Sequence, residues 1–457
     1  MTKSIKMLLI NKKYLLLLMV VSGLLIAGCD AKKETTSIQK TVEIQEWKTK
    51  NGARVLFVRA PELPMVDIQA VFDAGSVRDG NKKGIAKLTN GMLSHGAKLG
   101  NKVLSVDDVS ESFENIGARF GASTSKDNAE ISLRTLTDKK LLSKAVATMQ
   151  AIIKAPTFDK KELERVRKQL IIAFEGRKQS PSTIASENFY KGLYGSHPYA
   201  NPSIGTVESI KKLTRNDLIG FYKKYYVASN ALVTIVGDVD KAKAAKLAEQ
   251  VVGNLPVGEK AISLSAVNDF QTAASKHHEF PSSQTHVLIG QVGVHRKDKD
   301  YFTLYVANHI LGGSGFGSRI MQEIREKRGL AYSSYSYFAP MLKRGPFIMG
   351  MQTSNENSNE AMKVLKETLK TFIDKGPTEK ELLHSKKNIT GGFPLRIDSN
   401  SDISNYLAVI GFYNLPLSYL TDFNKKVEAV TLAQIKETVK RRIDTEKMLT
   451  VTVGTKK

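Results

Sequence analysis

The chain has almost no cysteine: Cys29 is the only one among 457 residues. A single cysteine cannot form a disulfide within the chain, so folds that depend on a disulfide framework are excluded. The hydrophobic content of 41% and the charged content of 25% are ordinary for a globular protein. The length exceeds what one hydrophobic core normally supports, so we expect two or more domains.

Acidic residues are scarce relative to basic ones. Aspartate and glutamate number 45 against 68 lysines and arginines, which gives a formal net charge of +23. Such an excess favours anionic lipids, nucleic acids or acidic peptides as partners. The lysines are scattered, however, and form no arginine-rich run or alternation with aromatic residues. We therefore interpret the charge as a solvated basic surface and expect no nucleic acid partner.

The N-terminus has the pattern of an export signal, with basic residues followed by an apolar run. The apolar run 15–26 follows several lysines and leads into Ile26-Ala27-Gly28-Cys29, which resembles a bacterial lipobox; the lysines are Lys3, Lys6, Lys12 and Lys13. We interpret residues 1–28 as a lipoprotein signal peptide and Cys29 as the lipidation site. A plain signal peptide followed by a chance cysteine is the alternative.

The polar stretch 29–42 is interpreted as a tether between the lipid anchor and the folded part. Several lipid chains on one residue hold a protein at a membrane more firmly than a single chain does. The expected location is the periplasmic side of a bacterial cell envelope. Asp30 follows the lipidated cysteine directly, and in enteric bacteria that residue favours retention in the inner membrane.

The remaining chain reads as two similar halves. A helix that begins after Thr214 and a strand that ends at Gly237 have counterparts after Thr431 and at Gly454, which indicates an internal duplication. We expect domains at 43–253 and 277–457, joined by a linker at 254–276. Strands and helices come in separate runs, so each half is predicted to be α+β. Expected strands cover 42–58 (a pair), 66–74, 121–136 (a pair), 231–236, 286–290, 330–338, 345–353 and 448–453.

Helices are predicted from apolar periodicity and from their caps. Thr214 and Ser358 are plausible N-caps, with Asp217 at the third position of the helix that Thr214 begins. The expected helices cover 84–96, 106–116, 141–153, 160–176, 181–194, 215–226, 301–311, 318–326, 358–375 and 432–442.

Several motifs together resemble the insulinase/pitrilysin family of zinc peptidases over residues 43–457. They are Gly75-Ser76-Val77-Arg78 before the helix at Gly84, the loop His197-Pro198-Tyr199-Ala200-Asn201-Pro202, the segment Tyr225 to Asp238, and the segment Leu311 to Tyr332. The resemblance implies two homologous α/β-sandwich domains, each a mostly antiparallel sheet with helices packed on it.

The helix that begins at Gly84 departs from the family pattern at the metal site. In the family it carries His-x-x-Glu-His, and Lys87, Asn90 and Gly91 stand at the positions of the two histidines and the glutamate. Lysine repels a metal ion, glycine offers no ligand, and asparagine cannot act as a base on metal-bound water. We therefore expect no zinc on this chain.

No other residues replace the missing ligands in the sequence. The position of the family's third ligand falls within 171–173, which holds no acid, and Glu175 is out of phase with it. None of the eight histidines lies four residues from another, and His277-His278 sits at the end of the linker, where adjacent side chains diverge. His197 belongs to the loop motif and is interpreted as structural. A metallopeptidase with an unusual site of its own is the alternative.

The second half keeps two residues that the resemblance marks as functional. Arg325 and Tyr332 match an arginine and a tyrosine that, in the family, face the zinc across a chamber and bind the substrate backbone and the developing oxyanion. A guanidinium and a phenol are suitable donors for that charge. The alternative is a surface arginine and a tyrosine packed in a sheet. Gly312, Gly313 and Gly315 are interpreted as a chamber loop, because a phosphate-binding glycine pattern is missing.

Some members of the family divide the work between two chains, one with zinc and one without. We therefore expect a zinc-ligand-deficient subunit, inactive alone, of an envelope metallopeptidase. Its expected partner is a homologous zinc-bearing subunit, and its expected substrate is a peptide. The alternative from a different class is a non-catalytic scaffold or peptide-binding lipoprotein without a peptidase partner.

Overall fold

The structure, a computed structural model, describes residues 42–456. The predicted signal peptide, Cys29, Asp30 and the rest of the tether before Val42 lie outside the described residues. From Val42 onward the chain forms one compact unit. Within it, none of the described helices combines the length and the apolar character needed to cross a bilayer.

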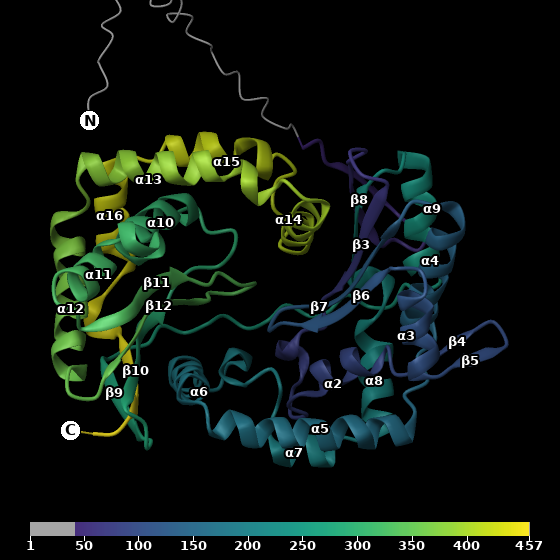
Figure 1. Cartoon of the computed structure of the whole chain (residues 1–457), viewed down its shortest axis with the longest axis horizontal. Helices are drawn as coiled ribbons and strands as arrows, with labels where there is room; N and C mark the ends of the chain where they lie inside the picture. The colour runs from purple at the N-terminus through teal and green to yellow at the C-terminus, as the bar shows by residue number, and fades with distance from the viewer. Residues whose placement is uncertain (1–41, 457) are drawn as a thin grey trace, which may run out of the picture. The chain divides into compact units, whose positions relative to one another are not determined.

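The first half, residues 42–253, is built on a six-stranded sheet of order β1-β2-β8-β3-β7-β6 (Figure 1). Strands β2 and β8 run parallel, and the other neighbouring strands run antiparallel. A separate hairpin joins β4 and β5. The strands are β1 (Gln45–Lys48), β2 (Arg54–Arg59), β3 (Met65–Phe72), β4 (Ala97–Leu99), β5 (Lys102–Leu104), β6 (Arg119–Thr124), β7 (Ala129–Leu136) and β8 (Ala231–Gly237).

The second half, residues 274–456, is built on a five-stranded sheet of order β11-β12-β10-β13-β9. Here β13 and β9 run parallel and the other neighbours antiparallel. Strand for strand, this order repeats β6-β7-β3-β8-β2 of the first sheet, so the predicted duplication and the mostly antiparallel α+β fold are confirmed. The strands are β9 (Ala274–Glu279), β10 (Gln284–Val292), β11 (Ala331–Phe338), β12 (Pro346–Ser354) and β13 (Leu449–Gly454).

All helices predicted in the first half are present, and α7 (Val207–Lys212) and α9 (Lys241–Val252) are additional to the prediction. The full set is α2 (Ile85–Met92), α3 (Val106–Glu114), α4 (Lys139–Lys154), α5 (Lys160–Lys178), α6 (Pro181–Tyr194), α7, α8 (Arg215–Tyr225) and α9, with single 3-10 turns η1 (Ser76–Arg78), η2 (Pro198–Ala200) and η3 (Ala228–Asn230). Helix α2 is shorter than predicted, because a turn from Met92 to His95 ends it before Gly96.

The helices of the second half include two π-helical segments. They are α10 (Tyr301–Asn308), η4 (His309–Gly313, π), η5 (Gly315–Gly317), α11 (Arg319–Met321), η6 (Gln322–Glu326, π), α12 (Ser358–Lys375), α13 (Glu379–Gly392), η7 (Pro394–Arg396), α14 (Asn400–Phe412), α15 (Tyr419–Glu428), α16 (Leu432–Arg442) and η8 (Thr445–Lys447).

The predicted caps are partly right. Thr214 accepts a hydrogen bond from the backbone of Asp217, whose carboxylate accepts one in return, and Thr431 begins α16 in the same way. The prediction that Ser358 is an N-cap is wrong: Asn357 holds that position, and Ser358 is the first helical residue. The Ser358 hydroxyl donates instead to the carbonyl of Asn355, because the turn after β12 extends to the helix start.

Each sheet is partly covered by a helix from the other half. Helix α14 of the second half packs on β8 and β3, and α6 of the first half packs on β13 and β10 (Figure 1). The contacts are close, since a Cβ on Gly411 of α14 would lie 2.5 Å from the Leu232 side chain. Gln69 also donates to Asn405 at 2.8 Å. The two halves therefore share their hydrophobic cores.

A buried carboxylate, Asp127, joins the two halves where β6 turns into β7. It accepts hydrogen bonds from the Tyr199 hydroxyl (2.9 Å), the Tyr413 hydroxyl (2.9 Å) and the backbone N–H of Leu342 (2.8 Å). Burial raises the pKa of Asp127, and the three donors oppose that shift. Its neighbour Lys126 donates to the carbonyls of Tyr199 and Asn201. The loop at 197–202 therefore contributes hydrogen bonds to the junction between the two halves.

Candidate functional site

The position that holds the glutamate in the family has become a structural anchor. Asn90 is 1% exposed. Its amide nitrogen donates to the carbonyls of Ser123 (2.6 Å) and Glu130 (3.3 Å), and its oxygen accepts from the Tyr226 hydroxyl (2.9 Å). The side chain thereby ties α2 to the edge of the first sheet and to the residue that ends α8. The hydrogen bonds of the Asn90 side chain therefore stabilise the fold.

Replacing Asn90 by alanine is expected to lower the free energy of unfolding by about 2–4 kcal/mol. The change removes two bonds to backbone carbonyls and leaves the Tyr226 hydroxyl buried without its acceptor. Urea denaturation measures the effect. The matched control is Lys87→Ala on the same helix, where the side chain is exposed and a change within about 0.5 kcal/mol is expected. Equal effects of the two substitutions would contradict the anchoring role of Asn90.

The other replaced positions offer nothing to a metal ion. A Cβ on Gly91 would have no atom within 4 Å. The nearby His95 lies 2.9 Å through Nδ1 from the Gly91 carbonyl, which can only accept, so that ring nitrogen donates. Burial lowers the pKa of His95 and favours the neutral ring. His95 is thus bonded to the last turn of α2.

The helix that carries the family's third ligand is equally unsuited. Ile172, in the matching stretch, is 72% exposed, and Glu175 forms an ion pair with Lys178 at 2.9 Å. Within residues 42–456, no three histidine, cysteine or acidic side chains are grouped closely enough to hold a metal ion. The residues present at the family's zinc position do not fit zinc, because a lysine, an amide and a glycine stand where two imidazoles and a base are required.

The second half brings its two predicted residues together. The Arg325 Nη1 donates to the Tyr332 carbonyl at 3.2 Å, and the guanidinium lies 4.2 Å from the centre of the Tyr332 ring. The guanidinium also lies 4.7 Å from the centre of the Phe316 ring. Phe316 is 62% exposed and Tyr332 79%. We refer to Phe316, Arg325 and Tyr332 as the Arg325 cluster.

Irregular backbone at Arg325 and at Tyr332 positions the Arg325 cluster. Arg325 lies in the π-helical segment η6, and π-turns often occur at functional sites. The register between β11 and β12 shifts between Ala331 and Ser333, so Tyr332 occupies a bulge. A β-bulge turns a side chain away from the regular alternation. This local geometry presents Tyr332 to solvent at the start of β11.

The glycine loop is shaped by close approach to β11. A Cβ on Gly312 would lie 2.5 Å from the Ser336 backbone nitrogen, and one on Gly313 would lie 2.8 Å from the Asn308 side chain. Gly315 has a φ of +62°, which favours glycine. The loop therefore follows the strand closely and then turns outward, and this turn carries Phe316 to Arg325. Sequence reasoning selected the glycines and missed Phe316.

A row of aromatic side chains extends along β11 from the cluster. Tyr335 and Tyr337 are partly exposed and stack with their ring centres 5.8 Å apart. They line a cavity of about 320 Å³ together with the β10 residue His286 and hydroxyls from α6 and β11; the hydroxyl residues are Ser182, Ser186 and Ser333. This polar and aromatic surface can accept peptide groups and side chains. Nothing in the sequence indicates this surface beyond tyrosines in a predicted strand.

The fold and the altered helix define a class: a two-domain zinc-peptidase scaffold whose metal ligands are replaced. Residues 54–207 match the insulinase family (peptidase family M16), and residues 212–389 match the peptidase M16 inactive domain. A solved structure described as a peptidase M16 inactive domain, from Pseudomonas fluorescens, is 40% identical, with a TM-score of 0.87, and covers 91% of this chain and 98% of that one. The chain belongs to the peptidase M16 family.

Other relatives fit this assignment. A protein of Helicobacter pylori named a non-peptidase homolog is 28% identical over 86% of this chain and 90% of its own length. The periplasmic protease of Escherichia coli shares the fold at 18% identity, with a TM-score of 0.76. The alignment covers 90% of this chain and 47% of that protease. The expectation of a zinc-ligand-deficient family member is therefore confirmed.

Proposed function

We propose that this chain is the zinc-ligand-deficient subunit of an envelope metallopeptidase and supplies Arg325 and Tyr332 to a homologous zinc-bearing chain. One contrast carries the proposal. At the family's zinc position Asn90 is committed to the fold, while Arg325 and Tyr332 remain in contact, with the Arg325 side chain 26% exposed and Tyr332 79% exposed. If the chain were simply an enzyme that had lost its activity, substitutions would be expected in both halves of the site.

The chemistry of the Arg325 cluster suits the role of a donor to bound peptide. A carbonyl under attack gains negative charge on its oxygen, and fixed donors stabilise that charge best when their positions are set in advance. The rings of Phe316 and Tyr332 both contact the guanidinium and restrict its position. The Tyr332 hydroxyl provides a second donor. The partner chain would bring the zinc; this chain contributes hydrogen bonds and the surface of β11.

The length of one relative supports a paired arrangement. This chain covers 47% of the Escherichia coli periplasmic protease. Two chains of this fold therefore match the length of that single protein, and association of this chain with a homologue would assemble an equivalent unit from two subunits. The substrate of such a unit is a peptide, because the exposed face of β11 offers tyrosines, serines and backbone rather than a compact charged pocket.

The test is reconstitution. Purified alone, the chain is expected to hydrolyse no peptide, and mixing it with a homologue that carries His-x-x-Glu-His is expected to produce cleavage that a chelator abolishes. Co-purification of the two chains would accompany this result. Zinc-dependent cleavage by the chain alone would overturn the proposal. Peptide binding along β11 with no peptidase partner would favour the alternative, a peptide-binding lipoprotein.

The envelope location is part of the proposal and has its own test. Cys29 is proposed to carry the lipid, and Cys29→Ser is expected to abolish incorporation of labelled fatty acid and to move the protein from the membrane fraction to the soluble fraction. Replacing Asp30 by serine while keeping Cys29 is the control, since it leaves the acylated residue intact. Unchanged labelling of the Cys29→Ser chain would contradict the assignment.

A further inference from the structure

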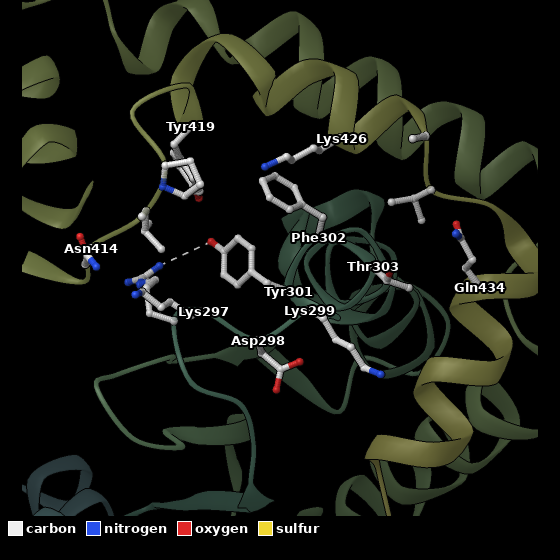
Figure 2. A pocket seen from close by; sticks show the side chains of 15 residues that line it. Lys297, Asp298, Lys299, Tyr301, Phe302, Thr303, Asn414, Tyr419, Lys426 and Gln434 are labelled. Carbon is white, nitrogen blue, oxygen red and sulfur yellow. Dashed lines mark hydrogen bonds between the residues drawn. The ribbon is translucent and has the colours of Figure 1, made fainter. Parts of the chain in front are cut away.

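A cavity of about 600 Å³ lies between the start of α10 and the helices α15 and α16 (Figure 2). It shares no residue with the Arg325 cluster. Its walls come from the loop before α10, the first turn of that helix, the loop at 414–416, α15 and the start of α16. The side chains of Tyr301, Phe302, Tyr419 and Lys426 gather in this space in Figure 2.

The cavity lining carries a net positive charge, with four cations and one acid, Asp298. Four cations line it: Arg296, Lys297, Lys299 and Lys426. Among the described residues, none of these four forms an ion pair. The nearby carboxylates are already engaged: Asp298 bonds to Arg442 at 2.8 Å, and Asp300 bonds to both Arg441 and Arg442. An anion entering the cavity would therefore find cations whose charges no acid of the fold neutralises.

Aromatic rings hold two of these cations in place. The Arg296 guanidinium lies 5.2 Å from the Tyr413 ring centre and 5.9 Å from that of Tyr301. Its Nε is buried and has no hydrogen-bond partner. The Lys426 ammonium lies 5.3 Å from the Phe302 ring centre. Cations fixed by rings lose little freedom when a ligand binds.

The helix start adds to the attraction for an anion. Asp300 occupies the N-cap of α10 but makes no capping hydrogen bond with its side chain, because both of its oxygens bind arginines. Phe302 and Thr303, in the first turn of α10, line the cavity. The partial positive charge of a helix N-terminus thus lies at the same place as the unpaired cations.

The rest of the lining is apolar. Leu415, Pro416 and Val430 join the rings of Phe302 and Tyr419 on the walls. A small hydrated anion would leave this surface unused. The lining therefore fits a ligand whose anionic group is attached to an apolar body.

We propose that this cavity binds the phosphate headgroup and the first chain segments of an anionic phospholipid. The choice of a lipid over a soluble phosphate rests on the proposed envelope location. It is also supported by the four cations and the apolar walls that line the cavity together. A net charge of +23 favours an anionic surface as well.

Calorimetry on the purified full chain tests the site without any partner or peptidase assay. The probes are dihexanoylphosphatidylglycerol below its micelle concentration, dihexanoylphosphatidylcholine and glycerol 3-phosphate. Phosphatidylglycerol is expected to bind at least about tenfold more tightly than either of the others, a difference of about 1.4 kcal/mol, and more weakly as salt is raised. Equal binding of the two lipids would overturn the proposal, and so would glycerol 3-phosphate binding as tightly as the anionic lipid.

Variants locate the binding. The double variant Lys299→Ala/Lys426→Ala removes two cations without disturbing the stack of Arg296 on its tyrosines, and it is expected to weaken phosphatidylglycerol binding by about tenfold or more. Arg296→Gln is expected to do the same. The control is Lys363→Ala, an exposed lysine on α12 outside the cavity, which is expected to leave binding unchanged. Equal loss in the control would show a diffuse surface effect and overturn the site. Failure of reconstituted proteolysis would leave all of these binding results unaffected.

Discussion

Arg325→Ala is expected to lower kcat/KM of the reconstituted pair by about 10²–10³-fold. Removing one preorganised donor to a developing oxyanion has an effect of this size. The substitution also releases Tyr332, whose carbonyl and ring both contact the guanidinium. The loss is expected mainly in kcat if the donor acts in the transition state, and in KM if it only binds the substrate backbone. Steady-state kinetics with a zinc-bearing partner in excess measures both.

Two further variants make the Arg325 experiment specific. Tyr332→Phe keeps the ring against the guanidinium and removes only the hydroxyl, so its effect reports the second donor alone. Arg328→Ala is the matched control: Arg328 lies three residues further on and pairs with Glu323 at 2.6 Å. We expect this control to change the rate less than about twofold, because a surface ion pair contributes little. A rate for Arg325→Ala equal to that of the control would disprove the proposed role.

Asp127→Ala is expected to lower the free energy of unfolding by about 3–5 kcal/mol. The substitution leaves three donors at the junction of the two halves without an acceptor: the hydroxyls of Tyr199 and Tyr413 and the N–H of Leu342. Buried donors without partners are costly because they have also lost water. Asp127→Asn should have a smaller effect, since its amide oxygen still accepts while its amino group meets a donor. Chemical denaturation gives the values.

The control for this stability measurement is another aspartate with a single exposed partner. Asp374 on α12 pairs with Lys370 at 3.1 Å, and both side chains are more than half exposed. Asp374→Ala is expected to cost less than about 1 kcal/mol. If Asp127→Ala proved no more destabilising than Asp374→Ala, the carboxylate would not hold the halves together, and the junction would depend on apolar packing alone.

Local signals in the sequence predicted the elements well where the caps are strong. Helix α6 runs from Pro181 to Tyr194 as expected, because Ser180 caps it, proline suits its first position and Gly195 ends it. The helix predicted at 301–311 is different: it becomes π-helical at His309. Apolar periodicity does not distinguish an α-turn from a π-turn, since the change depends on how the following glycines meet β11.

In the candidate site, too, the sequence pattern does not show features that depend on contacts with a distant strand. Arg325 and Tyr332 were identified by their motif, yet the reason for the exposure of Tyr332 is a bulge, and a bulge depends on register with the partner strand β12. Phe316 was missed because nothing local distinguishes a phenylalanine in a glycine loop from a core residue. The sequence pattern predicts that His277 and His278 lie at the end of the linker. The structure puts them in β9, where His277 contacts Thr452 and Glu279.

Because α6 and α14 each pack on the sheet of the other half, the chain cannot be divided at the linker into two independent domains. Neither half is a self-sufficient module, because each needs a helix encoded on the far side of the linker to cover its sheet. A fragment cut at the linker would expose an apolar face shaped for its missing complement. The two halves thus resemble complementary fragments that are joined in one polypeptide. A substitution on α6 or α14 therefore has to remain compatible with the sheet of the other half.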